Sequence, residues 1–172
     1  RRSSDLAESI RNLDDNIDGA GIEPNLYRLA PIVWQSGGTL FDESVGLFPP
    51  ITQNELAFKR LIELQTVHGV VPSQLKAESL SVEERFLAGQ LGMVFESRRL
   101  TPILRQSADF NWDVAPLPRG EQAAGVLHSD GYCLGKEPNP AALDFIRFAT
   151  SVRGQEIMAQ TGRTVPSRIA VA

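Results

Sequence analysis

Apolar residues recur at every third or fourth position along several stretches of the chain, which is the spacing of one helix face. The stretches are Ser4–Leu13, Leu26–Val33, Thr52–Val67, one from Ser81 to a stop at Gly89, one from Pro140 to Thr150, and a last one from about Ser151 to just before Gly162. Thr52 and Ser81 each precede a glutamate by three positions, as in a capping box. Asn139 precedes a proline suited to the first helical position. We therefore expect these helices to begin at their caps.

A different pattern organises the middle of the chain. Leu91–Phe95 is a short apolar run that predicts a buried strand, and it ends abruptly in the polar sequence ESRR, residues 96–99. Thr101-Pro102 then opens a short helix, and Trp112–Ala115 predicts a second strand that two prolines stop. A further strand is expected at Tyr132–Leu134. Strands between helices predict an α/β fold, in which ligands bind beyond the carboxyl ends of the strands.

Composition excludes several classes of protein. The 172 residues are 42% hydrophobic and 22% charged, with a mean hydropathy of −0.14, as in an ordinary globular domain. A net charge of −4 gives no support to nucleic-acid binding, and no apolar run is long enough to span a membrane. The single cysteine, Cys133, rules out an internal disulfide. The opening RRSSDLAE has no initiating methionine, signal peptide or lipid-attachment cysteine, which we interpret as a fragment or a processed chain.

Several motifs occur in an order that resembles a known family. Phe86, Gly89, Gly92 and Met93 precede the sequence DVAPLPRG, residues 113–120. The other matching segments are Trp34–Gly38, Gly131–Leu134, Asn139–Phe148 and Ser151–Pro166. From about Trp34 onward the chain resembles the extracellular solute-binding proteins of bacterial ABC importers, family 1, the group that contains the maltose- and glycerol-phosphate-binding proteins.

The resemblance implies an incomplete type II periplasmic-binding-protein fold. Residues 1–127 would form most of a carboxy-terminal α/β lobe, and residues 128–172 a strand and a helix pair that return towards the other, missing lobe. The implied function is capture of a small polar solute, namely a sugar, a polyol or a sugar phosphate, in a cleft between lobes. Delivery to ABC permease subunits would follow, without catalysis, cofactor or nucleic acid. The implied protein is a monomer, periplasmic or extracellular, and the resemblance also allows a lipoprotein anchor in its full-length form.

The expected ligand-binding residues come from four places in the chain. Trp34 would form an apolar wall or else fill the core, and Arg163 would approach the cleft or else hold a helix end. The others are Glu96, Ser97, Arg98 and Arg99 at the strand end, and Ser129, Asp130 and Gly131 in a loop that crosses between the lobes. Arg99 stands where sugar-binding relatives have a tryptophan, and Pro31 stands where the maltose-binding ones have a stacking aromatic residue. This departure favours a ligand with a carboxylate or phosphate, which two arginines hold well, or a site moved elsewhere.

Four alternatives remain open from the sequence. Asp14, Asn16 and Asp18 fit the first half of a calcium loop, although Asn25 stands where the loop needs glutamate. Ser73 and Lys76 fit the Ser-x-x-Lys signature of a hydrolase, but Ser129-Asp130-Gly131 lacks the asparagine and Gln160-Thr161-Gly162 the lysine of its companion motifs. The other two alternatives are a hydrolase site centred on His128 and a sensory solute-binding domain of the same fold.

Overall fold

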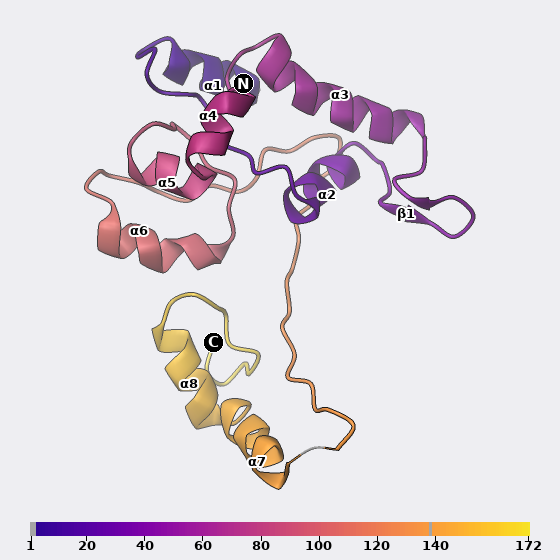
Figure 1. Ribbon diagram of the computed structural model, residues 1–172, viewed down its shortest axis with the longest axis vertical. Helices are drawn as coiled ribbons and strands as arrows, with labels where there is room; N and C mark the ends of the chain where they lie inside the picture. The colour runs from indigo at the N-terminus through magenta and orange to yellow at the C-terminus, as the bar shows by residue number, and fades with distance from the viewer. Residues whose placement is uncertain (1–2, 138) are drawn as a thin grey trace. The chain divides into compact units, whose positions relative to one another are not determined.

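The computed structural model describes residues 3–137 and 139–172, which fall into two units. Unit 1 comprises residues 1–96 and 109–126, and unit 2 comprises residues 97–108 and 127–172. Figure 1 labels most of the elements. They are α1 (Ser3–Arg11), α2 (Leu26–Gln35), β1 (Phe41–Asp42), β2 (Gly46–Leu47), α3 (Thr52–Thr66), α4 (Gln74–Ser79), α5 (Val82–Leu87), η1 (Arg98–Leu100), α6 (Thr101–Ser107), α7 (Pro140–Ala149) and α8 (Val152–Gln160). The assignment of residues 1–127 and 128–172 to lobes of a larger protein stays a prediction.

Unit 1 is built on a parallel pairing between two distant segments. Asp18 pairs with Leu91 and Gly21 with Val94, through hydrogen bonds such as that from Gly21 N to Met93 O at 2.8 Å. The predicted strand at 91–95 is thus present only as two isolated parallel bridges, not as a continuous strand. Ala20 N also donates to the carbonyl of Val70, which brings a third segment alongside. The buried core of this region comprises Ala7, Ala20 and Val70, with Leu64, Val71, Met93 and Phe95 packed against it.

A buried asparagine attaches a small hairpin to helix α3. Strands β1 and β2 pair antiparallel, Phe41 with Leu47. Asn54 accepts a hydrogen bond from Thr39 N at 3.1 Å and donates to the carbonyls of Thr39 and Pro49. The capping box predicted at Thr52 is wrong, because Ile51 occupies the cap position of α3 and makes no side-chain bond there. Asn54 instead makes hydrogen bonds to Thr39 and Pro49 in the segment that precedes α3.

The boundary signals at Ser81 and Gly89 are confirmed. Ser81 caps α5, and its side chain and that of Glu84 form the reciprocal bonds of a capping box. These bonds, first that from the Ser81 hydroxyl and then that from its amide, lower the pKa of Glu84 from its usual 4.5. Gly89 follows the helix with a φ of +70°, a left-handed conformation that glycine adopts without strain.

In unit 2, helices α7 and α8 follow one another at the carboxy-terminal end of the chain (Figure 1). Asn139 caps α7 and Ser151 caps α8, as the sequence predicts. A side-chain carbon at Gly154 would lie 2.3 Å from the carbonyl oxygen of Phe148, so the first turn of α8 contacts the end of α7 through a glycine. Tyr132 packs edge-on against Phe145 with ring centroids 5.9 Å apart, which joins the preceding extended segment to α7.

Two predicted strands are absent from this structure. The segments at Trp112–Ala115 and Tyr132–Leu134 have no regular secondary structure, and neither is assigned to a strand among the described residues. A strand needs a neighbour to receive its backbone hydrogen bonds, and the described part of the chain supplies none for these two. None of the helices described here is long and apolar enough to cross a membrane.

Candidate solute-binding site

Glu96 lies at the end of the parallel pairing, where the sequence predicts ligand contact, and it contacts a cation in unit 1. The Nη2 group of Arg28 donates a hydrogen bond to Glu96 Oε1, and the two form an ion pair. Their side chains are only 14% and 11% exposed. The strand end therefore presents a carboxylate that a guanidinium already neutralises.

Arg28 is the residue of this site that the sequence predictions missed. It lies in the first turn of α2, which begins at the Asn25 cap; the cap side chain accepts a hydrogen bond from the Arg28 amide at 3.1 Å. The signal that would have found Arg28 is its isolation, since it is the one charged residue in the ten-residue sequence of α2, LYRLAPIVWQ. A lone charge in an apolar helix needs a partner, because burying an unpaired charge is costly.

Trp34 lies at the other end of α2 and is half-buried. Its carbonyl accepts a hydrogen bond from Gln122 Nε2 at 2.7 Å, while the Gln35 carbonyl accepts one from Glu121 N at 2.8 Å. The segment around residues 120–124 is thus fastened to the end of this helix. Trp34 as a ligand wall stays a prediction.

Other predicted site residues belong to unit 2. The Nε group of Arg98 donates to the carbonyl of Gly162 at 3.0 Å, which brings the turn at residues 97–99 close to the chain that leads to Arg163. Arg98, Arg99 and Arg163 are exposed, and Ser97 is partly buried. Ser129, Asp130 and Gly131 lie in an exposed extended segment of the same unit. The structure thus joins Arg98 to the 162–163 turn and Arg28 to Glu96, and the binding role of these residues stays a prediction.

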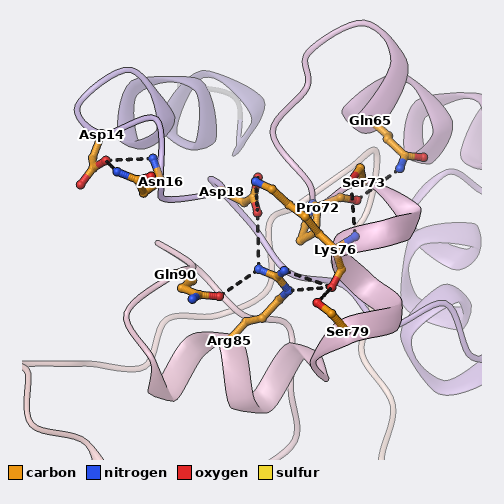
Figure 2. Close-up of polar contacts among 10 residues, drawn as sticks. All are labelled: Asp14, Asn16, Asp18, Gln65, Pro72, Ser73, Lys76, Ser79, Arg85 and Gln90. Carbon is orange, nitrogen blue, oxygen red and sulfur yellow. Dashed lines mark hydrogen bonds and ion pairs between the residues drawn. The ribbon is translucent and has the colours of Figure 1, made fainter.

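The residues of the calcium and hydrolase alternatives make other contacts. Figure 2 shows Asp14 bonded to Asn16, while Asp18 pairs with Lys76 and Arg85. Lys76 Nζ lies 3.2 and 3.3 Å from the two carboxylate oxygens of Asp18, and the hydroxyl of Ser73 accepts from the backbone amide of residue 76. Neither a calcium loop nor a Ser-Lys nucleophile is supported by this arrangement. Across residues 3–137 and 139–172, no group of three His, Cys, Asp or Glu side chains is placed to hold a metal ion.

Two hollows lie on unit 1 apart from the Arg28–Glu96 pair. A groove of about 640 Å³ is lined by aromatic rings that include Phe86, Phe110 and Trp112, the first two packed edge-on at 5.4 Å. A smaller cleft of about 280 Å³ is lined by polar side chains, among them Arg11 and Lys76. The predicted ligand-binding residues line neither of them.

Two solved structures of sugar-binding proteins match this fold. One is the ABC substrate-binding protein Lmo0181 from Listeria monocytogenes in complex with cycloalternan, with a TM-score of 0.83 at 21% sequence identity over 97% of this chain. The other is maltose-bound MalE3 of T. maritima, with a TM-score of 0.75 at 19% identity over 98% of this chain. No protein-family model and no curated protein matches the sequence.

The chain has the fold of part of an ABC sugar-binding protein. The resemblance noted in the sequence is therefore confirmed in three dimensions, and so is the expected α/β fold of the periplasmic binding proteins. The chain spans 44% and 47% of the lengths of the two matched proteins, which fits part of a two-lobe fold. Both of these neighbours are binding proteins rather than enzymes.

Proposed function

We propose that this chain belongs to the substrate-binding component of an ABC importer, which captures a small polar solute for delivery to the permease. The solute class is a sugar, a polyol or a sugar phosphate. The observation that carries the proposal is the fold, which nearly the whole chain shares with two proteins that bind sugars. Its partners are the solute and the membrane subunits of the importer.

Binding proceeds by closure of two lobes over the solute. Polar side chains replace the water around the solute, and the closed state is favoured only by contacts that the open state lacks. The residues assigned to these contacts are Trp34, Glu96, Ser97, Arg98, Arg99, Ser129, Asp130, Gly131 and Arg163. Such a protein works as a monomer outside the cytoplasmic membrane, in the periplasm or at the cell surface, and a lipid can anchor its full-length form.

Calorimetric titration of the 172-residue chain tests this proposal. The panel comprises maltose, cycloalternan, simple polyols and sugar phosphates, and the recovered solute is analysed by mass spectrometry. We expect saturable binding of at least one compound, returned unchanged. Thermal unfolding gives a second readout, because a ligand at about 100 times its Kd stabilises the native state by about 2.7 kcal/mol. Conversion of a bound compound would indicate an enzyme, and absence of binding across the panel would overturn the proposed solute class.

A further inference from the structure

Arginine side chains from two distant segments meet at the turn that follows α8. The Nε group of Arg98 donates a hydrogen bond to the carbonyl of Gly162 at 3.0 Å. The guanidinium of Arg105 lies beside the same residue, since a side-chain carbon added at Gly162 would lie 3.4 Å from its Nη1 atom. Arg163 follows directly in the sequence, and all three arginines are exposed. We call Arg98, Arg105 and Arg163 the arginine surface, and all three belong to unit 2.

Stabilisation of a helix end explains only part of this grouping. The carboxy-terminal end of a helix carries a partial negative charge, and a nearby cation is favourable there. At the end of α7 one arginine, Arg168, donates from its Nε group to the carbonyl of Thr150. Arg98 makes the equivalent bond just beyond the end of α8. The second guanidinium beside Gly162 is therefore more than the end of α8 requires.

Carboxylates do not neutralise the arginine surface. None of the ion pairs between residues that the structure describes includes one of its three arginines. The acidic residues of α7 and α8 pair within their own helices, Asp144 with Arg147 at 3.1 Å and Glu156 with Arg153 at 3.4 Å. Unit 2 has eight Lys and Arg residues against four Asp and Glu, whereas the whole chain has a net charge of −4. This surface is thus a local positive charge that attracts anions.

The arginine surface also keeps most of its hydrogen-bond donors. A guanidinium has five N–H donors in one plane. Arg98 uses its Nε group for Gly162, and its two Nη groups donate to nothing in the part of the chain that the structure describes. Arg105 makes no hydrogen bond to any described residue. Such a planar group binds a carboxylate or a phosphate through two parallel hydrogen bonds.

We propose that the arginine surface binds the carboxylate or phosphate group of the solute. The inference rests on the proposed function, because it names the solute class, which is a sugar acid or a sugar phosphate rather than a neutral sugar or polyol. Arg98 is held at the turn and presents its Nη groups, and Arg105, which the sequence predictions missed, supplies a second guanidinium. Because both side chains are exposed, added salt screens their charge and weakens the binding of the anionic group.

Pairs of compounds that differ in one group measure this preference. Glucose is compared with glucuronic acid and with glucose 6-phosphate, and glycerol with glycerol 3-phosphate, by calorimetric titration of the 172-residue chain. We expect the anionic member to bind at least about tenfold more tightly at low ionic strength, and this advantage to shrink at high ionic strength. Inorganic phosphate reports on the anionic group alone and should bind more weakly than either sugar phosphate. The readout is the ratio of the two Kd values in each pair.

Substitutions in the arginine surface should lower this ratio. Arg105→Gln removes one guanidinium without breaking a hydrogen bond between described residues, and Arg98→Gln removes the other. We expect each to reduce the preference about tenfold. Arg105→Lys keeps the charge but not the parallel bonds and should retain part of the preference. The matched controls are Arg147→Gln and Arg153→Gln, which remove the same charge from exposed arginines that already have carboxylate partners, and they should leave the ratio unchanged.

The outcomes separate this inference from the proposed function. If no compound of the panel binds, the proposed function fails and the inference fails with it. If glucose or glycerol binds at least as tightly as its anionic partners, the inference fails while the proposed function stands. The inference also fails if folded Arg98→Gln and Arg105→Gln variants keep the wild-type ratio, or if the two controls lower it equally.

Inorganic phosphate gives one further outcome. If it binds as tightly as glucose 6-phosphate, the arginine surface is a site for any small anion, and its role in solute binding is overturned. Should Arg98→Gln not fold, Arg105→Gln decides, because it removes a side chain that makes no hydrogen bond in the described structure.

Discussion

The carboxylate of Asp18 lies 3.2 Å from the ammonium nitrogen of Lys76. Arg85 approaches the same carboxylate at 3.9 Å and donates further hydrogen bonds to the carbonyl of Lys76 and to Gln90 Oε1, both at 3.0 Å (Figure 2). The side chains of Asp18 and Arg85 are 10% and 7% exposed, whereas that of Lys76 is 46% exposed. The buried Asp18–Arg85 pair thus connects α5 to the parallel pairing in unit 1, and the half-exposed Lys76 connects α4 to it.

Replacing Asp18 by asparagine destabilises the chain strongly. The substitution leaves the buried guanidinium of Arg85 without its anion, and breaking a buried ion pair costs about 3 kcal/mol or more. Lys76→Met is the contrasting variant: because Lys76 is half-exposed, its ion pair contributes about 1 kcal/mol or less. Urea unfolding of both variants measures the difference. Equal losses of unfolding free energy in the two variants would contradict the interpretation that Arg85 is the buried partner of Asp18.

The same aspartate illustrates why a local motif misleads. In the sequence, Asp14, Asn16 and Asp18 suggest a calcium loop, because only their spacing is visible. In the structure Asp18 contacts Lys76 and Arg85, which lie much further along the chain. The polar turn that remains is a bond between Asp14 and Asn16, the ordinary turn chemistry of such residues. A long-range ion pair has no signature in local spacing.

Helix boundaries were predictable where the signal was local. The Ser81 capping box and the Asn139 cap with its following proline are confirmed, because such bonds involve residues three positions apart or fewer. The prediction of strands depended on pairing partners that lie far away in the sequence. The apolar run at Leu91–Phe95 pairs with residues 18–21, and no sequence feature pointed to that partner. The segment at Trp112–Ala115 has the composition of a strand but no neighbouring strand in the described structure.

The candidate site was predictable only in part, because some of its residues have local signals in the sequence and others depend on distant contacts. Glu96 stood out because it ends an apolar run, a local change of character. Arg28 did not, because its role depends on contact with Glu96 across 68 positions. The loop residues Ser129, Asp130 and Gly131 were named by resemblance alone and stay a prediction.

Asn54 tests how far the β1–β2 hairpin depends on one buried side chain. Asn54→Ala removes three hydrogen bonds at a buried position and leaves both backbone groups of Thr39 without these partners. We expect a loss of about 2 kcal/mol or more in the free energy of unfolding. Asn54→Asp is the sharper variant, because a carboxylate cannot donate to the carbonyls of Thr39 and Pro49 and should cost at least as much. Thermal unfolding ranks them, and an unchanged midpoint in either would show that the hairpin does not depend on this side chain.

Gly120 tests the contact that fastens residues 120–124 to the end of α2. A side-chain carbon at this position would lie 2.7 Å from the carbonyl oxygen of Gln35, which is too close for the backbone to tolerate. Gly120→Ala should displace the segment, weaken the bond from Glu121 N to Gln35 O and cost about 1 kcal/mol or more. Amide hydrogen exchange at Glu121 reports this directly. Gly125→Ala is the matched control, since nothing lies within 4 Å of the added carbon there, and it should leave that exchange rate unchanged.

The Ser81–Glu84 capping box makes part of the stability depend on pH. The pKa of Glu84 is lowered in the folded chain by hydrogen bonds first from the Ser81 hydroxyl and then from its amide. A group with a depressed folded pKa contributes stability above its unfolded value, near 4.5, and that contribution disappears as the pH falls through the folded value.

Replacing Glu84 by glutamine isolates this contribution. Gln also suits the third position of a capping box, so Glu84→Gln keeps the bonds to Ser81 but does not titrate. Urea unfolding between pH 7 and about pH 3 should show the wild-type chain losing more stability than the variant in the acidic range, with the two curves parallel above about pH 6. Identical acid curves for wild type and Glu84→Gln would mean that the capping bonds do not distinguish the two protonation states of Glu84.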